Sequence, residues 1–170
     1  MDAGTELLAG DDGVREAIRL LAHFLYAEAG GESVRAREAL AATISNQVDQ
    51  LLGSSGDELR GPWRVEALRG LAFVHCLDRL GATAGVQSHD DDAVFASCRR
   101  IARRALSGAL RDPTCGATRF HAIGISPAWS RSLNPRAWIG SFLFYSEEEA
   151  EGGQDDDGAE PRVTTDCESA

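Results

Sequence analysis

The sequence lacks the features that mark several large classes of protein. No window approaches the roughly 20 consecutive apolar residues that a membrane-spanning helix needs, and no stripe of basic residues suits a nucleic-acid partner. The chain contains no CxxC pair, HExxH, P-loop, GxGxxG or GxSxG motif. We therefore expect no membrane span, no nucleic acid, no metal and no cofactor.

A signal peptide is not visible either. The first residues, MDAGTELLAGDDG, lack its basic segment and its apolar segment, so on this observation alone the chain is expected to be cytoplasmic. Residues 1–13 are rich in Gly and Asp and are expected to be loose. The four cysteines allow disulfides, but a chain of 170 residues can bury a core without them.

Acidic residues are concentrated at one end of the chain. Residues 147–170 hold ten of the 27 acidic residues and one of the 17 basic residues, which leaves the rest nearly neutral. Composition of this kind predicts an acidic disordered tail at 147–170. Residues 14–146 then form a single domain, which we expect to be monomeric.

Apolar residues repeat at helical spacing in three segments. The pattern predicts a first helix from Val14 to the Gly30-Gly31 pair and a second from Ser33 to Leu52. A third helix should open with the acidic residues 90–92 and end before Asp112. Its four arginines suit a solvated face or a groove for an anionic polymer. Segment 57–90 is compatible with a helix starting near Pro62 or with a loop lining a cleft.

The character of the sequence changes after Asp112. Residues 117–122 and 138–145 have the composition of short strands, and the Pro-, Ser- and Gly-rich segment 124–135 between them is expected to be a loop. The sequence therefore predicts an α+β fold, mainly helical, with a small antiparallel β lobe.

Glu28 stands out among the polar residues. It falls in the last turn of the first predicted helix, where the partial negative charge of the helix end disfavours a carboxylate. Phe24 and Leu25, one turn earlier on the same side, should remove water from it. A carboxyl group kept neutral is what a general acid in glycoside cleavage needs, although a partly solvated structural Glu would have the same sequence position.

Four segments together resemble a known family. LYAEAGGE at 25–32 is similar to the Y-G/A-E-A-R-G-E box of SleB-type cell wall hydrolases, the spore cortex-lytic enzyme family, and Ala39, Ala42 and Asn46 match its second helix. DPTCGATRFH at 112–121 resembles the D-P-T-G-G-A-T-x-Y/F-H box. SPAWSR at 126–131 and IGSFLFY at 139–145 match the closing segments.

The chain also departs from the family pattern. Gly30 replaces an Arg, Val48 stands where Arg is usual, Cys115 replaces a Gly, and Ser141-Phe142 stands where His is common. The family's middle box survives only as AFVHC at 72–76. Because that box helps to line the cleft, these departures bear mainly on substrate fit.

The resemblance implies a lysozyme-like or lytic transglycosylase-like domain that cuts peptidoglycan glycan strands. Glu28 would protonate the oxygen between N-acetylmuramic acid and N-acetylglucosamine and then accept the proton of the muramyl C6 hydroxyl, which gives a 1,6-anhydro product. Hydrolysis by water is the alternative outcome. Glu32, the nearest other acid, is interpreted as a supporting residue. The wall lies outside the cytoplasm, so this function conflicts with the missing signal peptide, and the location stays open.

Aromatic residues are the candidates for a sugar-binding wall, because flat rings suit the apolar faces of sugars. Core packing is the alternative for each of them, and a hydrogen-bonded strand histidine is the alternative for His121. The candidates are Tyr26, Phe73, Phe120, His121 and Trp129.

Three other interpretations remain open. The first is a zinc site of His and Cys residues (His75, Cys76, Cys98, Cys115, His121), although their spacing matches no zinc pattern. The second is a catalytically weakened relative that binds peptidoglycan or another glycan without cleaving it. The third is an interaction protein whose acidic tail binds the partner.

Overall fold

The computed structural model describes residues 3–53, 65–72 and 92–146, with side chains from residue 11 onward. Three long helices, α1 (Ala3–Ala29), α2 (Val34–Leu52) and α4 (Ala93–Leu106), precede three short strands. The strands are β1 (Arg119–Ala122), β2 (Ala137–Ile139) and β3 (Phe142–Tyr145), and a 3-10 helix, η1 (Ala128–Ser132), lies between β1 and β2. The predicted α+β class, mainly helical with a small antiparallel lobe, is confirmed.

Helix α1 starts earlier than the sequence suggested. The prediction that residues 1–13 are loose is wrong for the described residues 3–13, which are helical. The side chain of Arg15 reaches back to Asp11 at 2.6 Å and to Asp12 at 3.6 Å, and pairs at these spacings stabilise a helix. The three glycines in this stretch each cost about 1 kcal/mol, which weakens a helix without breaking it.

Helices α2 and α4 begin where their sequences predict. The side chain of Ser33 accepts a hydrogen bond from the backbone N–H of Ala36 and caps α2. The carboxylate of Asp92 accepts from Val94 and Phe95 and caps α4. A further short helix covers residues 65–72, and the remainder of segment 57–90 lies outside the described residues.

The β lobe is a three-stranded antiparallel sheet in the order β1-β3-β2. The prediction of a strand through 138–145 is wrong in one respect, because Gly140 and Ser141 form a two-residue turn that makes β2 and β3 a hairpin. Gly140 has a φ of +59°, which side chains disfavour and which such hairpin turns require. The segment predicted as a loop contains η1, which starts after Pro127.

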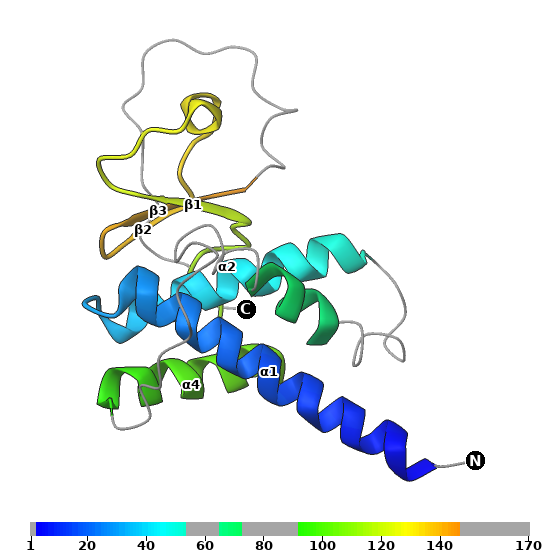
Figure 1. The fold of residues 1–170 in the computed structure, drawn as a ribbon. Helices are drawn as coiled ribbons and strands as arrows, with labels where there is room; N and C mark the ends of the chain where they lie inside the picture. Colours follow the sequence, from blue (N-terminus) through cyan, green and yellow to red (C-terminus); the bar gives the residue numbers. More distant parts are fainter. Residues whose placement is uncertain (1–2, 54–64, 73–91, 147–170) are drawn as a thin grey trace.

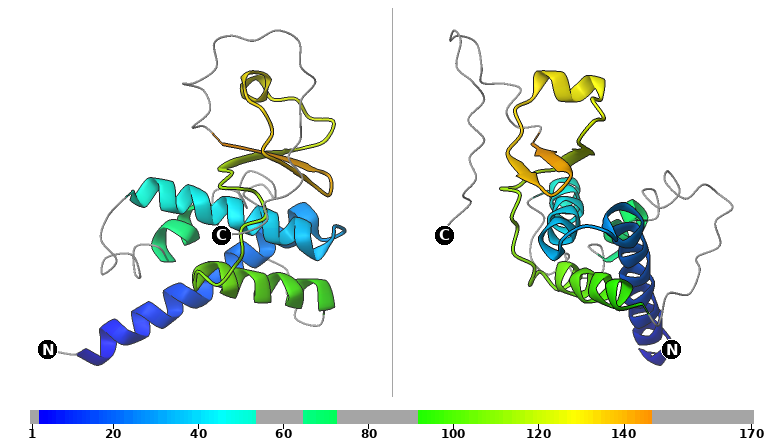
Figure 2. Two further views of the ribbon diagram at one scale, coloured as in Figure 1. Left: turned by 180° about the vertical axis from the view of Figure 1, so that it is seen from behind. Right: turned by 90° about the vertical axis from the view of Figure 1, so that its left-hand side faces the viewer.

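The sheet stacks on the helices with one face. Figures 1 and 2 show the β lobe above α2 and the end of α1, with α4 on the opposite side of the helical layer. Alternate strand residues face the helices, so Phe120, Phe142 and Phe144 join the core formed by α1, α2 and α4. No helix among the described residues is long and apolar enough to cross a membrane.

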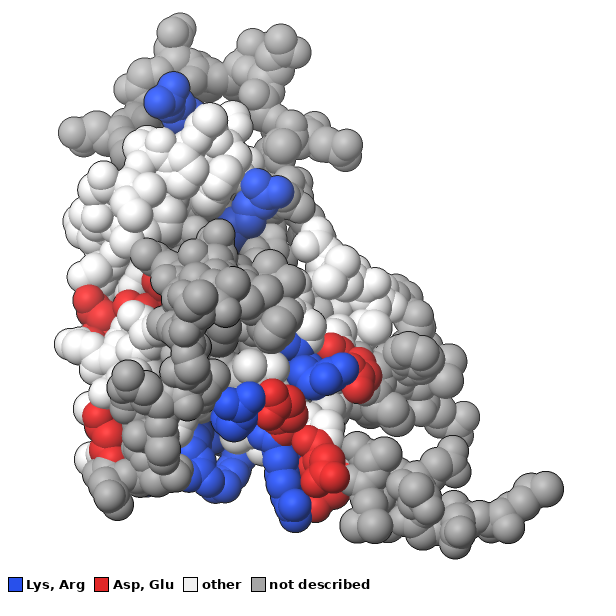
Figure 3. Space-filling model, viewed as in Figure 1, with Lys and Arg blue, Asp and Glu red and all other residues white. Residues whose placement is uncertain are grey.

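Charged residues are distributed unequally between the helical layer and the β lobe. In the view of Figure 3 the acidic and basic side chains gather over the helices, whereas the β lobe shows mostly uncharged atoms. On the exposed side of α4 the guanidinium of Arg104 contacts the carboxylate of Glu38 at 2.7 Å. This ion pair favours, for Arg104, the solvated-face interpretation over a groove for an anionic polymer.

Candidate functional site

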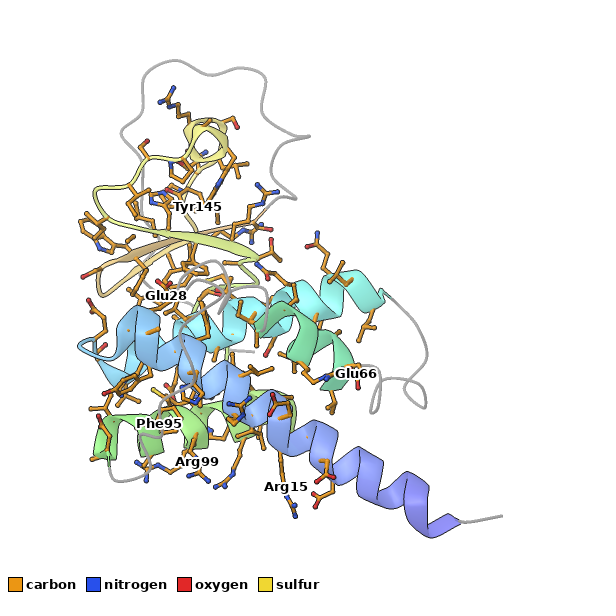
Figure 4. All side chains as sticks on the ribbon, in the orientation of Figure 1. Arg15, Glu28, Glu66, Phe95, Arg99 and Tyr145 are labelled. Carbon is orange, nitrogen blue, oxygen red and sulfur yellow. The ribbon has the colours of Figure 1, made fainter. Side chains whose placement is uncertain are left out.

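The end of α1 carries the predicted acid. Glu28 is half-buried in the last turn of α1, on the same helical face as Phe24 and Leu25, which are 1% and 0% exposed. Figure 4 places Glu28 between the helical layer and the sheet. Its carboxyl group therefore lies at the junction of the two layers, beside a dry apolar surface.

The backbone after Glu28 is adapted to glycine. The N–H of Gly30 donates to the carbonyl of Tyr26 at 2.9 Å, and a Cβ on Gly30 would lie 2.6 Å from that same carbonyl oxygen. Any side chain at this position would therefore require the turn to shift.

Glu32 connects this turn to the β lobe. Its carboxylate accepts a hydrogen bond of 2.7 Å from the hydroxyl of Ser141, in the turn between β2 and β3. A Cβ on Gly140 would lie 2.6 Å from Glu32 Oε2 and 3.0 Å from the Cβ of Ala36. The hairpin turn therefore packs directly on the α1–α2 connection, and Glu32 has the geometry of a supporting residue.

The loop before β1 is organised by one carboxylate. Asp112 accepts hydrogen bonds from the N–H and the hydroxyl of Thr114, at 2.7 and 2.6 Å, and from the N–H of Gly116 at 2.7 Å. Thr114 is fully buried, so these bonds satisfy groups that have no access to water. The DPTCG segment is therefore a structural cradle that directs the chain into β1.

Two amides of α2 hold this cradle against the helices. Asn46 donates from Nδ2 to Asp112 Oδ2 and to the carbonyl of Ala117, both at 3.0 Å. Gln47 donates to the carbonyl of Thr118 at 2.5 Å. The second-helix segment and the DPT segment, about 70 residues apart in the chain, are thus in direct contact.

Phe120 is a predicted sugar-binding residue that packs toward the helices. It is half-buried on the helix-facing side of the sheet, with its ring 6.2 Å from that of Phe24. It also packs against the rings of Phe142 and Phe144. Since Phe24 is one turn from Glu28, Phe120 and Glu28 belong to the same side of the sheet.

His121 and Trp129 lie on the other side. His121 alternates with Phe120 and therefore faces away from the helices, where its ring stacks on Tyr145 at 5.2 Å and meets Trp129 at 5.7 Å. The hydroxyl of Tyr145 donates to His121 Nε2 at 2.9 Å, because the other ring nitrogen donates to the carbonyl of Ala122. Burial raises the pKa of Tyr145. The guanidinium of Arg119 lies 5.3 Å above the Trp129 ring.

Tyr26 faces α4. Residues two apart in a helix differ by about 200° in direction, so Tyr26 and Glu28 point to opposite sides of α1. The hydroxyl of Tyr26 donates to Asp92 at 2.6 Å, and its ring meets Phe95 edge-on. This hydrogen bond to a carboxylate raises the pKa of Tyr26.

The predicted aromatic wall is thus divided among three places. Phe73, its remaining member, lies outside the described residues, and so does the predicted acidic tail.

The described cysteines differ in state. Cys98 is a buried free thiol on α4, and burial raises its pKa. Cys115 has a φ of +58° and is disulfide-bonded. Among the described residues no group of three or more His, Cys, Asp or Glu side chains could hold a metal ion.

Sequence reasoning did not assign the roles of Asp112, Gln47 and Ser141. The spacing Asp-x-Thr is typical of a carboxylate that caps its own loop and was the available signal for Asp112. Nothing local marks Gln47 or Ser141, because their partners are distant in the chain. Comparisons of the chain with protein-family models, with curated proteins and with solved structures returned no match.

Proposed function

We propose that this protein cleaves the glycan strands of bacterial peptidoglycan at the bond between N-acetylmuramic acid and N-acetylglucosamine, with Glu28 as the acid. The proposal includes a lysozyme-like arrangement of helices and β lobe and membership of the SleB-type cell wall hydrolases. The observation that carries it is the convergence of four of the resembling segments through side-chain contacts.

That convergence depends on two sets of contacts. Glu32, from the first segment, is joined to Ser141 of the closing segment at 2.7 Å. Asn46, from the second-helix segment, is joined to Asp112 and Ala117 of the DPT segment. Residues selected separately by resemblance thus form one connected structure, as they would if they supported one site.

Glu28 is suited to the acid step by its position. The half-buried carboxyl group lies at the C-terminal end of α1, beside Phe24 and Leu25, which are 1% and 0% exposed. From this position it would donate a proton to the glycosidic oxygen as the C–O bond breaks.

The proposed reaction uses one carboxyl group twice. Glu28 protonates the leaving oxygen, the muramyl C6 hydroxyl attacks C1 of the oxocarbenium-like centre, and the Glu28 carboxylate takes the hydroxyl proton. The glycosidic C–O bond is exchanged for the C–O bond of a 1,6-anhydro ring, and no water is consumed. Most glycosidases need a second carboxylate. Glu32, the acid closest to Glu28 in the sequence, accepts a hydrogen bond from Ser141, which supports the single-acid scheme.

A glycan-binding module without cleavage is the second candidate. It is favoured by the division of the aromatic residues, because His121 and Trp129 lie on the sheet face opposite to Glu28. The same face carries Trp138, whose side chain is 57% exposed and could stack on a sugar ring.

Two assays on purified sacculi separate the candidates. If the protein is an enzyme, the wild type should clear a suspension of sacculi and the Glu28→Gln variant should not. Both proteins should co-sediment with sacculi. A binding module should co-sediment without clearing. Clearing by Glu28→Gln at the wild-type rate would refute the role of Glu28.

A further inference from the structure

Helix α4 gathers arginines on one side and supplies no acid of its own. Its sequence, AVFASCRRIARRAL, contains four arginines and neither Asp nor Glu. Arg103 follows Arg99 by one turn and Arg104 follows Arg100, so helical spacing places the four side chains next to one another. We call these four residues the α4 arginine face. Figure 4 shows Arg99 on the side of α4 that is turned away from the β lobe.

Arginines of two neighbouring helices are neutralised within their own helix. In α1 the guanidinium of Arg19 contacts the carboxylate of Glu16 at 2.6 Å. In the short helix at 65–72 Arg69 contacts Glu66, also three residues earlier and also at 2.6 Å. Pairs at this spacing stabilise a helix, whereas like charges at the same spacing destabilise it.

The α4 arginine face retains positive charge. Arg104 contacts Glu38 of α2, but no acid of the described residues forms an ion pair with Arg100 or Arg103, and both of these side chains are exposed. The partial negative charge of the helix end favours Arg103, in the last turn, but it does not reach Arg100, one turn earlier. The repulsion between these side chains would be relieved by an anionic partner.

The chain itself carries a segment of the opposite charge. Residues 147–170, the acidic tail, hold ten acidic residues and one basic residue and directly follow the last described residue, Ser146. Fully extended, 24 residues span about 80 Å, whereas a domain the size of residues 14–146 has a radius of gyration of about 14 Å. The tail is therefore long enough to reach any face of the domain. Its covalent link gives it an effective concentration of roughly millimolar at such a face.

We infer that the acidic tail binds the α4 arginine face of its own chain. Carboxylates of the tail would accept hydrogen bonds from the guanidinium groups, a pairing that is stronger than one between neutral groups. The inference is independent of the proposed glycan cleavage, because α4 and the β lobe lie on opposite sides of the helical layer (Figures 1 and 2).

The test follows backbone amide shifts of the full-length ¹⁵N-labelled protein at pH 7 while NaCl is raised from about 20 mM to about 500 mM. This change shortens the Debye length from about 20 Å to about 4 Å and should release the tail. For the wild type, amides of residues 99–104 and of the acidic tail should shift along the same salt transition. Shifts confined to the tail, with residues 99–104 unmoved, would overturn the inference.

Variants on each side of the contact make the test specific. In Arg100→Gln/Arg103→Gln the salt-dependent shifts of the tail should be at least about twofold smaller, because two of the four cations are gone. Arg19→Gln is the matched control, since Arg19 is paired within α1, and it should leave those shifts unchanged. Equal shifts in the wild type and in folded Arg100→Gln/Arg103→Gln, or an equal loss in Arg19→Gln, would contradict the contact.

The reciprocal variant and the protein concentration complete the test. Neutralising the run of acids at 155–157 with Asn should reduce the salt-dependent shifts of residues 99–104, and unchanged shifts there would overturn the inference. The shifts should not depend on protein concentration, because the tail belongs to the same chain. Shifts that grow on tenfold concentration would assign the arginine face to a second copy of the chain and refute binding within one chain.

Discussion

Ser141 donates a hydrogen bond of 2.7 Å to the carboxylate of Glu32, across 109 residues of sequence. This bond joins the turn of the β hairpin to the connection between α1 and α2. Because Glu28 is four residues before Glu32, the position of the β lobe relative to the proposed acid depends on this contact. The hairpin turn should therefore tolerate few substitutions.

Gly140→Ala should lower the free energy of unfolding by about 2–3 kcal/mol. The residue has a positive φ, which costs a side chain about 1–2 kcal/mol, and the new Cβ would lie 2.6 Å from Glu32 Oε2. Urea denaturation measures the change. Gly31→Ala is the matched control, since a Cβ there meets nothing within 4 Å. Equal effects of the two substitutions would show that the turn is not packed as described.

Asp112→Ala should destabilise the protein by about 2–4 kcal/mol, because it removes the acceptor of four hydrogen bonds and leaves buried Thr114 unsatisfied. A double-mutant cycle with Asn46→Ala should give a coupling energy of about 1–2 kcal/mol. Additive effects in thermal denaturation would mean that the loop and α2 are independent.

Tyr26→Phe should cost about 1–2 kcal/mol of stability, because it removes the 2.6 Å bond to Asp92 and leaves the ring contact with Phe95 in place. Calorimetry at pH 7 measures the loss. In an Asp92→Ala background the same change should cost much less, since the acceptor is already gone. An undiminished cost there would contradict the proposed pairing.

Cys98 should make stability fall at alkaline pH. Its pKa is raised by burial, so the folded protein holds the thiol proton more tightly than the unfolded chain does. The contribution is complete below the unfolded pKa of about 8.5 and is lost as the pH rises through the folded pKa. Cys98→Ala should show a smaller loss of stability from pH 8 to 10 than the wild type under non-reducing conditions. Parallel pH profiles would contradict this assignment.

The helices were predictable where their signals are local. Ser33 and Asp92 cap α2 and α4 where the sequence places them, and glycine ends α1. The early start of α1 was missed because the ion pairs of Arg15 offset the Gly and Asp content of residues 10–13. The hairpin was missed because the turn residues Gly140 and Ser141 are flanked directly by apolar residues on both sides.

The candidate site was harder to predict. Phe120 and His121 were predicted to belong to one sugar-binding wall, but as adjacent strand residues they lie on opposite faces of the sheet, and only the packing shows that the Phe120 face meets the helices. The partner of Tyr26 is 66 residues away, and no local pattern reveals it. The aromatic candidates were predicted as one group. In the structure Tyr26 faces α4, Phe120 faces the helices, and His121 and Trp129 lie on the other face of the sheet.

The most direct test of the central claim is mass spectrometry of peptidoglycan fragments after digestion by wild type, Glu28→Gln and Glu32→Gln. Glu32→Gln is the matched control, because its amide oxygen can still accept the bond from Ser141. The account predicts 1,6-anhydro-muramyl products from the wild type and from Glu32→Gln, and none from Glu28→Gln. The claim would be contradicted if the wild type released no fragments, or if Glu28→Gln released the same products at a similar rate.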